Sequence, residues 1–452
     1  MELRDVDLIV IGSGQGGVPL AADAARSGKR VVLFERERYG GSCINFGCTP
    51  SKALLAAAHN AGRARRAARI GIHCDVRVDQ PAVFERVRAI RERWSAGTRR
   101  RLVDAGVELV HASAAFVGER TVQGGQVVVR APRVVIDTGT SPAAPPIPGL
   151  AQTPFLTNKT FFDLKALPTR LLIVGGGYIG LELGQGARRL GCEVTILQRG
   201  PRLLPEEEAD ASAAIATGLA EDGVTVRLNA NTSGVTYAGG SFTVTLDGEE
   251  PVSGEALLIA TGRTPNVVDL DLEKSGITRT RGGFIEVDEY LETRCPGVYA
   301  IGDVSGQPAF THVSWEDYRR LASTFAGSPR RRDDRVLSYT TFTEPQLARC
   351  GLTEAQARAK GIDARSVTMP LSQVARAVEW DLELGFFRLV IDNATDKLIG
   401  ATFVGYEMGE LIHIITAHVE AGATWQLLDR SMYVHPTLAE GLPGLARQFS
   451  GG

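Results

Sequence analysis

The chain has 452 residues, a length typical of about three domains, and its 44% hydrophobic and 23% charged residues are ordinary for a globular protein. Fifty basic residues nearly balance 52 acidic ones, and a net charge of -2 favours neither nucleic acid nor an acidic membrane surface. The apolar stretches are strand-sized, and the first residues lack the layout of a signal peptide. We therefore expect a cytoplasmic protein that binds neither nucleic acid nor membrane.

The chain opens with a strand–loop–helix–strand pattern. Residues 7–11 (DLIVI) predict a buried parallel strand, and Gly12, Gly14 and Gly17 follow with G-x-G-x-x-G spacing before a helical run. A second strand ends at Glu35. Such a loop brings backbone amides to a pyrophosphate, and a carboxylate in this position accepts hydrogen bonds from both ribose hydroxyls. The pattern predicts a dinucleotide site with an unphosphorylated ribose.

A close pair of cysteines follows at the expected start of a helix, in residues 43–52 (CINFGCTPSK). Cys43 and Cys48 are near enough in sequence to close a small ring. The helix N-terminus and Lys52, one turn beyond Cys48, would both stabilise a thiolate. Two buried structural cysteines or half of a zinc site are the alternatives, but zinc would require a second pair nearby and Cys74 stands alone. The motif therefore favours redox chemistry.

A second glycine-rich motif begins after the proline-rich residues 141–149 (SPAAPPIPG), which predict a domain boundary. The strand predicted at residues 171–174 leads into Gly175, Gly177 and Gly180, again with the G-x-G-x-x-G spacing and a following helix. The sequence therefore predicts two separate nucleotide-binding units.

The two units differ at the end of their second strand. Gln198 occupies the position that Glu35 has in the first unit, and Arg199 and Arg202 follow it. A neutral side chain with neighbouring guanidinium groups suits a 2′-phosphate better than a free ribose, so we expect NADPH in preference to NADH. The alternative is that both arginines are simply solvated in a strand-end loop.

The last part of the chain has a different pattern of predicted strands and helices. Residues 256–266 and 297–304 predict further strands, and from about Ser338 onward strands alternate before a long helix near residues 408–421. This predicts a third, mixed α/β domain. The arginine-rich residues 63–69 have no interleaved aromatic residues, which favours a solvated helix face over a nucleic-acid surface.

His435 and Glu440 form a potential acid–base pair near the C-terminus. A carboxylate that holds one imidazole nitrogen fixes the tautomer and makes the other nitrogen more basic. An isolated pair of this kind also occurs by chance on protein surfaces. Other histidines, among them His413, have no such partner, and we expect them to be structural.

Together, residues 40–52, the two nucleotide units, Gly302-Asp303 and residues 435–440 (HPTLAE) resemble the class I pyridine nucleotide–disulfide oxidoreductases. This family includes dihydrolipoamide dehydrogenase, glutathione reductase and mercuric reductase. The resemblance implies an α/β homodimeric enzyme with two Rossmann-like domains and a C-terminal dimerisation domain. The implied boundaries are residues 1–145 and 262–335 for FAD, 146–261 for NAD(P)H and 336–452 for the dimer interface.

The resemblance also implies roles for the redox residues. Cys43 would be the interchange thiol and Cys48 the charge-transfer thiol against the flavin. His435 and Glu440 would serve the cysteines of the partner subunit.

Further roles follow around the cofactors. Lys52 would pair with Glu182 near flavin N5, Tyr178 would cover the nicotinamide pocket, and Asp303 would hold the FAD ribityl chain. The remaining residues implied are Arg36, Gly41, Ser42, Thr138, Gly139, Thr311 and His312 for FAD, and Ile179 and Gly262 for NAD(P)H.

The electron acceptor depends on conflicting signals. Residues 14–20, 198–202 and 310–314 most resemble mercuric reductase-like sequences, but no cysteine follows Cys350, whereas mercuric reductases carry a C-terminal pair. The His435 pair instead fits disulfide reduction. We expect a small-molecule or protein-bound disulfide acceptor, with a mercuric reductase-like metal-ion reductase and a flavoprotein redox sensor without turnover as alternatives.

Overall fold

The first glycine-rich motif lies between a central strand and a helix, as predicted. In the computed structural model, which describes residues 2–451, β2 (Leu8–Ile11) leads through the loop into α1 (Gly17–Arg26). The next strand, β3 (Val31–Glu35), pairs in parallel with β2. All four residues of β2 are buried, which explains its uninterrupted apolar sequence, because a central parallel strand is covered on both faces.

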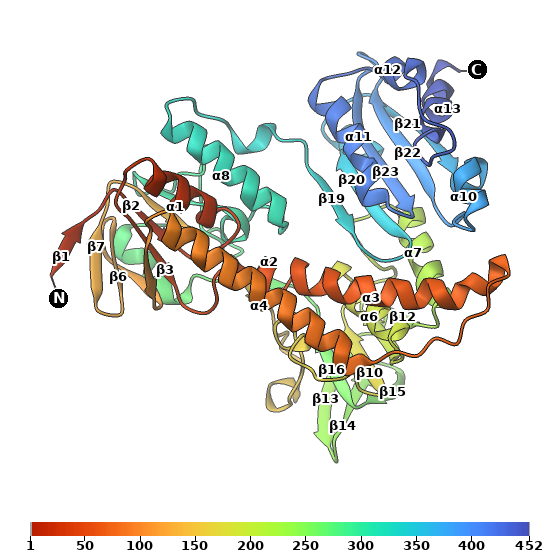
Figure 1. Ribbon diagram of the computed structural model, residues 1–452, viewed down its shortest axis with the longest axis horizontal. Coiled ribbons are helices and arrows are strands. Elements are labelled where there is room, and N and C mark those ends of the chain that lie inside the picture. The colour runs from red at the N-terminus through yellow and green to blue at the C-terminus, as the bar shows by residue number, and fades with distance from the viewer. Residues whose placement is uncertain (1, 452) are drawn as a thin grey trace.

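Strands from distant parts of the chain complete this sheet. Its order is β18-β8-β2-β3-β4, and all neighbouring strands run parallel. The added strands are β4 (Glu108–His111), β8 (Val134–Ile136) and β18 (Val298–Ala300). Because β18 follows the second unit in sequence, the chain returns to the first sheet after forming the second. Helix α8 (Thr311–Phe325) then lies beside α1 (Figure 1).

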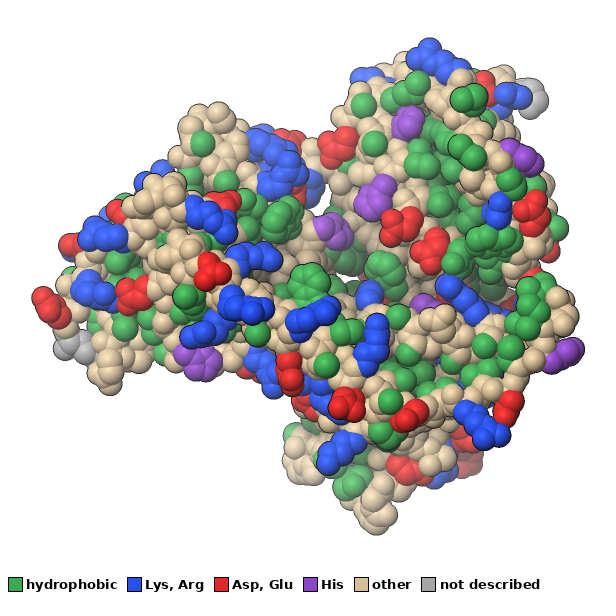
Figure 2. Space-filling view, in the orientation of Figure 1, with side chains coloured by type: hydrophobic (Ala, Val, Ile, Leu, Met, Phe, Trp, Pro, Cys, Tyr) green, Lys and Arg blue, Asp and Glu red, His purple; other side chains and the backbone are tan. Residues whose placement is uncertain are grey.

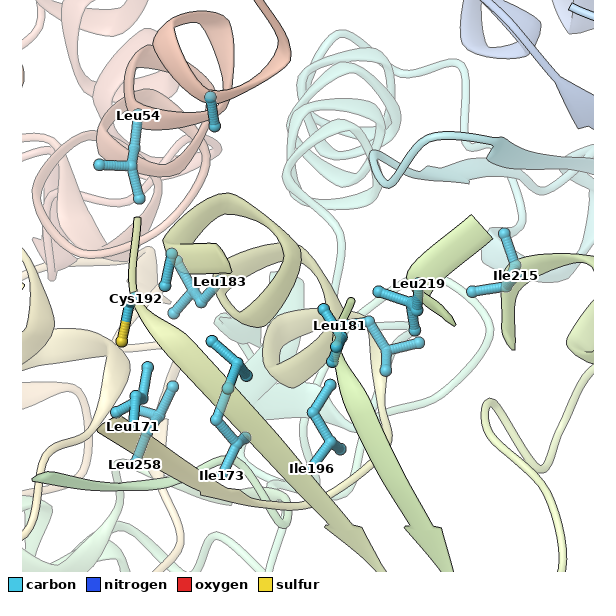
Figure 3. Packing of buried hydrophobic residues seen from close by; sticks show 14 of the residues in the cluster. Leu54, Leu171, Ile173, Leu181, Leu183, Cys192, Ile196, Ile215, Leu219 and Leu258 are labelled. Atoms are coloured by element: carbon cyan, nitrogen blue, oxygen red, sulfur yellow. The ribbon is translucent and has the colours of Figure 1, made fainter. Parts of the chain in front are cut away.

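The second glycine-rich motif builds a separate parallel sheet with the order β12-β11-β10-β16. Its elements are β10 (Arg170–Val174), α6 (Tyr178–Arg189), β11 (Glu193–Gln198), α7 (Ala209–Glu221), β12 (Thr225–Leu228) and β16 (Ala256–Ile259). Figure 3 shows Leu171, Ile173 and Ile196 of this sheet facing Leu181 of α6, with Leu54 of the cysteine-bearing helix at the edge of the same cluster. The core therefore joins the cysteine region to the second unit.

Two long helices connect the lobes. α3 (Cys48–Arg66) follows the short α2 (Gly41–Asn45) and packs against both α6 and α4 (Gln80–Asp104). In Figure 1, α3 and α4 run through the centre of the molecule. Two smaller sheets consist of β1 (Leu3–Asp5), β5 (Ala114–Gly118), β6 (Thr121–Gly124) and β7 (Val127–Arg130), and of β13 (Thr232–Ala238), β14 (Ser241–Leu246) and β15 (Glu249–Gly254).

The third predicted domain is an antiparallel sheet covered by helices. Its order is β19-β20-β23-β22-β21. The strands are β19 (Ser338–Thr341), β20 (Gln346–Gly351), β21 (Ala364–Pro370), β22 (Phe386–Asp392) and β23 (Leu398–Gly405). The helices include α11 (Met408–Glu420), α12 (Trp425–Arg430) and α13 (Gly441–Arg447). The predicted fold class, with two Rossmann-like units and a mixed α/β third unit, is confirmed.

The surface carries both signs of charge. Figure 2 shows acidic and basic side chains distributed over the visible face, which is hollowed between the lobe that contains α8 and the lobe that contains α11. Within residues 2–451, no helix combines the length and the apolar character required to cross a membrane.

Candidate active site

The two cysteines of the motif lie at the start of α3 and face one cavity. Cys48 is the first residue of this 19-residue helix, so its sulfur lies at the positive end of the helix dipole. Cys43 and Cys48 both line a cavity of about 570 Å³, and both are free thiols. The Cys48 Sγ atom lies 3.0 Å from the Oγ1 atom of Thr311, the first residue of α8. The fold thus brings two sulfurs, a hydroxyl group and a helix N-terminus together.

Their surroundings shift the pKa values of the two thiols in opposite directions. A hydrogen bond from Cys43, supported by Thr311 and by the positive charge of Lys52, lowers the pKa of Cys48 to about 6. The hydrogen bond to Cys48, together with burial, raises the pKa of Cys43 above its ordinary value. At neutral pH, Cys48 is therefore a thiolate that accepts a hydrogen bond from the Cys43 thiol.

An ion pair behind the cysteines joins three elements. The Lys52 Nζ atom lies 2.7 Å from the Glu182 Oε2 atom on α6. The Glu182 carboxylate is buried, and its other oxygen accepts a hydrogen bond of 2.9 Å from the Phe342 amide. The Lys52 ammonium also lies 4.5 Å from the centre of the Phe342 ring. The pair implied by the family resemblance is formed, and it fixes a positive charge one turn from Cys48.

A second, smaller cavity contains the first glycine-rich loop. The Glu35 carboxylate accepts hydrogen bonds from the Ser13 amide (3.0 Å) and the Ser13 hydroxyl (2.5 Å), and it lines this cavity. Gly12 has a φ of +99°, and a Cβ atom there would lie 2.4 Å from the Asp137 carbonyl oxygen, so glycine is required. The residues that line both cavities are Gly14, Gly41, Ser42, Phe46, Asp137 and Thr138.

The other residues expected around FAD lie mainly along these two cavities. Asp303 accepts a hydrogen bond of 2.8 Å from the Thr140 hydroxyl and lines the larger cavity. Arg36 lines the smaller cavity, where it pairs with Asp269. Gly139, Thr311 and His312 line the larger one. Gly17 lies outside both linings, and its amide binds the Asp137 carboxylate instead.

The second unit contributes fewer of its expected residues to the larger cavity. Tyr178 and Ile179 line it, and the Tyr178 ring centre lies 5.9 Å from that of Phe310. The Gln198 side chain accepts a hydrogen bond of 3.0 Å from the Gly176 amide. The residues outside the cavity lining are Gly175, Gly177, Gly180, Gln198, Arg199, Arg202 and Gly262. These residues surround the loop and strand end of the second unit, as their sequence positions predict.

The histidine pair is formed but is separate from the cysteines within one chain. The His435 Nδ1 atom lies 2.8 Å from the Glu440 Oε2 atom, and 75% of the imidazole side chain is exposed. His435 does not line the cavity that contains Cys43. Met432 and Val434, immediately before it, are exposed to 99% and 76%. The histidine therefore lies on an open, partly apolar surface.

Three residues that line the cavities escaped the sequence reasoning. His413 was expected to be structural, but it lines the larger cavity, as does Glu410 one turn earlier on α11. Asp137 was not singled out, although it lines both cavities and is buried. No local motif could have revealed these residues, because only the packing of distant elements brings them to the cysteines and to the glycine-rich loop.

The match to a family model identifies the kind of protein. Residues 6–317 match the pyridine nucleotide-disulphide oxidoreductase family, and residues 337–446 match the dimerisation domain of pyridine nucleotide-disulphide oxidoreductases. The chain belongs to this family. It is therefore an oxidoreductase that uses FAD and a pyridine nucleotide, and the electron relay from NAD(P)H to a disulfide fits its site.

Individual relatives cover nearly the whole chain. A mercuric reductase from Streptomyces lividans is 37% identical, over 98% of this chain and 96% of its own length. A dihydrolipoyl dehydrogenase from Thermus scotoductus is 34% identical, over 97% and 96%. The Cu(II) complex of the HOCl-induced flavoprotein disulfide reductase RclA from Escherichia coli superimposes with a TM-score of 0.90 at 30% identity, over 98% and 99%. The relatives thus share this fold, but their names describe different reactions.

Proposed function

We propose that this enzyme uses electrons from NADPH to reduce a disulfide, either a small molecule or a protein-bound group, with Cys43 and Cys48 as its redox-active pair. The observation that carries the proposal is the Cys48 thiolate at the start of α3, in one cavity with Cys43 and Thr311. A free thiolate beside a protonated thiol is the arrangement required of a reduced dithiol that is ready for exchange.

The cavities fit FAD along their whole length. Glu35 supplies the carboxylate for a ribose, and Gly12 and Gly14 let the loop pack closely against Asp137, where a Cβ atom at either would clash. A glycine-rich loop at the start of a helix is a typical pyrophosphate site. Asp303 and Thr311 line the larger cavity beside the cysteines, where the ribityl chain and the flavin ring would be held. When bound, FAD supplies the carrier that accepts two electrons from a nicotinamide and delivers them to a disulfide.

The dithiol chemistry then follows from the two sulfurs. Cys43 loses its proton to a base and attacks one sulfur of the acceptor, which forms a mixed disulfide and releases the first acceptor sulfur as a thiolate. Cys48 then attacks Cys43 Sγ, which closes the Cys43–Cys48 disulfide and releases the second thiolate. The acceptor gains two electrons and the cysteine pair loses two. His435 carries the proton from Cys43 to the departing sulfur.

A second copy of the chain must supply that histidine. Within one chain His435 lies outside the cysteine cavity, on the surface that exposes Met432 and Val434. Large exposed apolar side chains of this kind are typical of an interface, and the matched dimerisation domain contains them. We therefore propose a homodimer in which His435 and Glu440 of each subunit serve the cysteines of the other.

NADPH is the proposed donor because of the charges around Gln198. The Gln198 amide is neutral, and Arg199 is exposed beside it without a carboxylate partner within 4 Å among the described residues. Arg202 is also exposed, although it donates a hydrogen bond of 2.8 Å to the Pro205 carbonyl oxygen. Two cations, with a neutral glutamine in place of the glutamate of the first unit, favour a 2′-phosphate.

A metal-ion acceptor is the second candidate, because mercuric reductases are among the relatives and the RclA structure is a Cu(II) complex. Within residues 2–451, no cluster of three or more His, Cys, Asp or Glu side chains is arranged to hold a metal ion. A metal-ion acceptor would bind at Cys43 and Cys48, and the Cys43 thiol would have to lose its proton.

An acceptor panel separates the two candidates. The purified enzyme, supplied with NADPH, is assayed by stopped-flow spectroscopy against lipoamide, glutathione disulfide, Hg(II) and Cu(II). We expect turnover with at least one disulfide and loss of that turnover in both Cys43→Ser and Cys48→Ser. Turnover with metal ions alone would make the metal-ion reductase the correct function.

A further inference from the structure

A buried carboxyl group lies directly beneath the first glycine-rich loop and takes no part in the thiol chemistry. Asp137 follows β8 and is 6% exposed. Its Oδ2 atom accepts a hydrogen bond of 2.6 Å from the Gly17 amide at the start of α1. Its Oδ1 atom lies 3.4 Å from the Ser314 hydroxyl, which donates to it. A Cβ atom at Gly14 would lie 2.5 Å from Oδ2, so the glycine-rich loop packs directly against this carboxyl group.

Asp137 lies where the two cavities meet. It lines the cavity that contains Glu35 and also the cavity that contains the cysteines. A dinucleotide with its ribose at Glu35 and its flavin at the cysteines has its pyrophosphate between them, and this group carries two negative charges. No lysine or arginine is among the residues that line both cavities. The doubly charged pyrophosphate would therefore lie near the Asp137 carboxyl group, with no lysine or arginine from this shared lining to neutralise them.

The neighbouring elements bring two further carboxyl groups toward Asp137, and an arginine lies beside each of them. Asp303, just after β18, and Asp317 on α8 both face Asp137, and the glycine-rich loop carries no titratable side chain. The nearby arginines are engaged by these carboxylates: Arg335 pairs with Asp317, and Arg263 lies 3.8 Å from Asp303. Arg320 is bound by Asp334 and Glu316. Among residues 2–451, no lysine or arginine forms an ion pair with Asp137.

These surroundings decide the charge of the group. Burial, together with the negative charges of Asp303 and Asp317, raises the pKa of Asp137 to about 8, against the opposing hydrogen bonds from the Gly17 and Gly16 amides. The carboxyl group is consequently mostly protonated at neutral pH. An ionised Asp137 would require the pyrophosphate to bind beside a buried negative charge.

The second nucleotide unit shows that the fold does not require this acid. A Cβ atom at Gly12 would lie 2.4 Å from the carbonyl oxygen of Asp137, and one at Gly175 would lie 2.4 Å from that of Ala260. Ala260 therefore occupies the position of Asp137 in the second unit. The acid belongs to the first unit alone.

We propose that Asp137 is a positioning residue for FAD, held as a neutral acid beneath the pyrophosphate, and that its ionisation in alkaline solution weakens the retention of the cofactor. This inference rests on the FAD placement proposed above. Because FAD binds the protonated form, its affinity is constant at low pH and falls as the pH rises through the titration of the unliganded chain. The loss is up to about tenfold for each pH unit above that titration.

The test measures retention of FAD by the full-length holoenzyme. Diluted enzyme is equilibrated between pH 6 and pH 9.5, and the released FAD is measured by its fluorescence to give a Kd. In the wild type, the Kd should rise about fivefold between pH 8 and pH 9, because the unliganded group is half-titrated near pH 8. Asp137→Asn, which keeps the shape without the charge, should show no such rise. Asp75→Asn, on an exposed loop, is the matched control and should follow the wild type. Equal slopes in Asp137→Asn and the wild type would overturn the proposal.

A second measurement needs no variant, in case Asp137→Asn does not fold. FAD is added back to the full-length wild-type chain in weak buffer with a pH indicator. Binding at pH 9 should take up close to one proton, and binding at pH 6 almost none. Absence of proton uptake at pH 9 would overturn the proposal even if FAD binds. Failure of the chain to bind FAD at any pH would instead contradict the FAD placement itself.

Discussion

The two nucleotide units share a backbone and differ in the side chains placed on it. In the first, the Glu35 carboxylate binds the amide of Ser13 at 3.0 Å; in the second, the Gln198 amide oxygen binds the amide of Gly176 at the same distance. The strand end thus directs a side chain to the loop in both units. The fold fixes where this side chain lies, and we propose that its charge selects the nucleotide. Substitutions of Glu35 and Gln198 test the effect of side-chain charge within the two units, and a substitution of His435 tests a group outside both.

The largest effect is expected outside both units, at His435. We expect His435→Ala to slow disulfide reduction by about 10²- to 10⁴-fold, because the departing thiolate loses its proton donor. The transfer of electrons from NADPH to the flavin should remain nearly unchanged, since neither nucleotide unit contains this residue. Stopped-flow measurement of the two half-reactions provides the comparison.

Glu440→Gln tests the same histidine pair with a milder change than His435→Ala. It should slow the same half-reaction by a smaller factor, because Glu440 holds the imidazole at 2.8 Å and does not itself transfer the proton. An unchanged rate of acceptor reduction in His435→Ala would mean that the pair is structural. A metal ion, which needs no proton from a general acid, would then be the better acceptor.

In the first unit, Glu35→Gln should weaken FAD binding about ten- to a hundredfold. The amide replaces a carboxylate that, in the proposed placement of FAD, would accept charge-assisted hydrogen bonds from the ribose, each of which contributes about 1.5–3 kcal/mol. The Kd for FAD is measured by fluorescence titration. Glu108→Gln is the matched control, because Glu108 lies on the neighbouring strand β4 but pairs with Arg4 and lines neither cavity. Equal losses in the two variants would point to general destabilisation of the sheet.

The reciprocal change, Gln198→Glu, should make the second unit favour a nucleotide with a free ribose, as proposed for the first unit. A carboxylate at this position repels a 2′-phosphate and accepts hydrogen bonds from a free ribose. We expect the ratio of kcat/KM for NADPH to that for NADH to fall about ten- to a hundredfold. The FAD content should stay unchanged, which serves as the internal control. A wild type that already prefers NADH would show that Arg199 and Arg202 are merely solvated.

Local sequence was sufficient for the parts of the molecule that are built locally. The glycine spacing after an apolar strand, and a cysteine pair before a helical run, identified both nucleotide units and the start of α3. Asp137 escaped because it lies 120 residues from Gly17, and only the pairing of β8 with β2 brings the two together. The pair between Lys52 and Glu182 spans 130 residues and was expected only from the family resemblance.

The placement of His435 shows a different limit. Its contact with Glu440 spans five residues, so the sequence alone suggested it. The role proposed for it at the cysteines depends on a second copy of the chain, which neither the sequence pattern nor a single subunit contains.

The smallest expected effect concerns the Cys48 thiolate. It lies in the cavity that contains part of the first glycine-rich loop, whereas the second unit contributes residues of α6 there, namely Tyr178, Ile179, Glu182 and Leu183. In Cys43→Ser, which cannot form the disulfide, a long-wavelength charge-transfer absorption between Cys48 and the flavin should be present in the oxidised enzyme. It should disappear as the pH falls, because the pKa of Cys48 is lowered to about 6 and protonation removes the thiolate. A serine hydroxyl still donates to Cys48, so the midpoint should shift upward by less than about one pH unit. Cys48→Ser should lack the absorption at every pH. An ordinary cysteine has a pKa of about 8.5. If the midpoint in Cys43→Ser is at or above this value, then α3, Thr311 and Lys52 do not stabilise the thiolate.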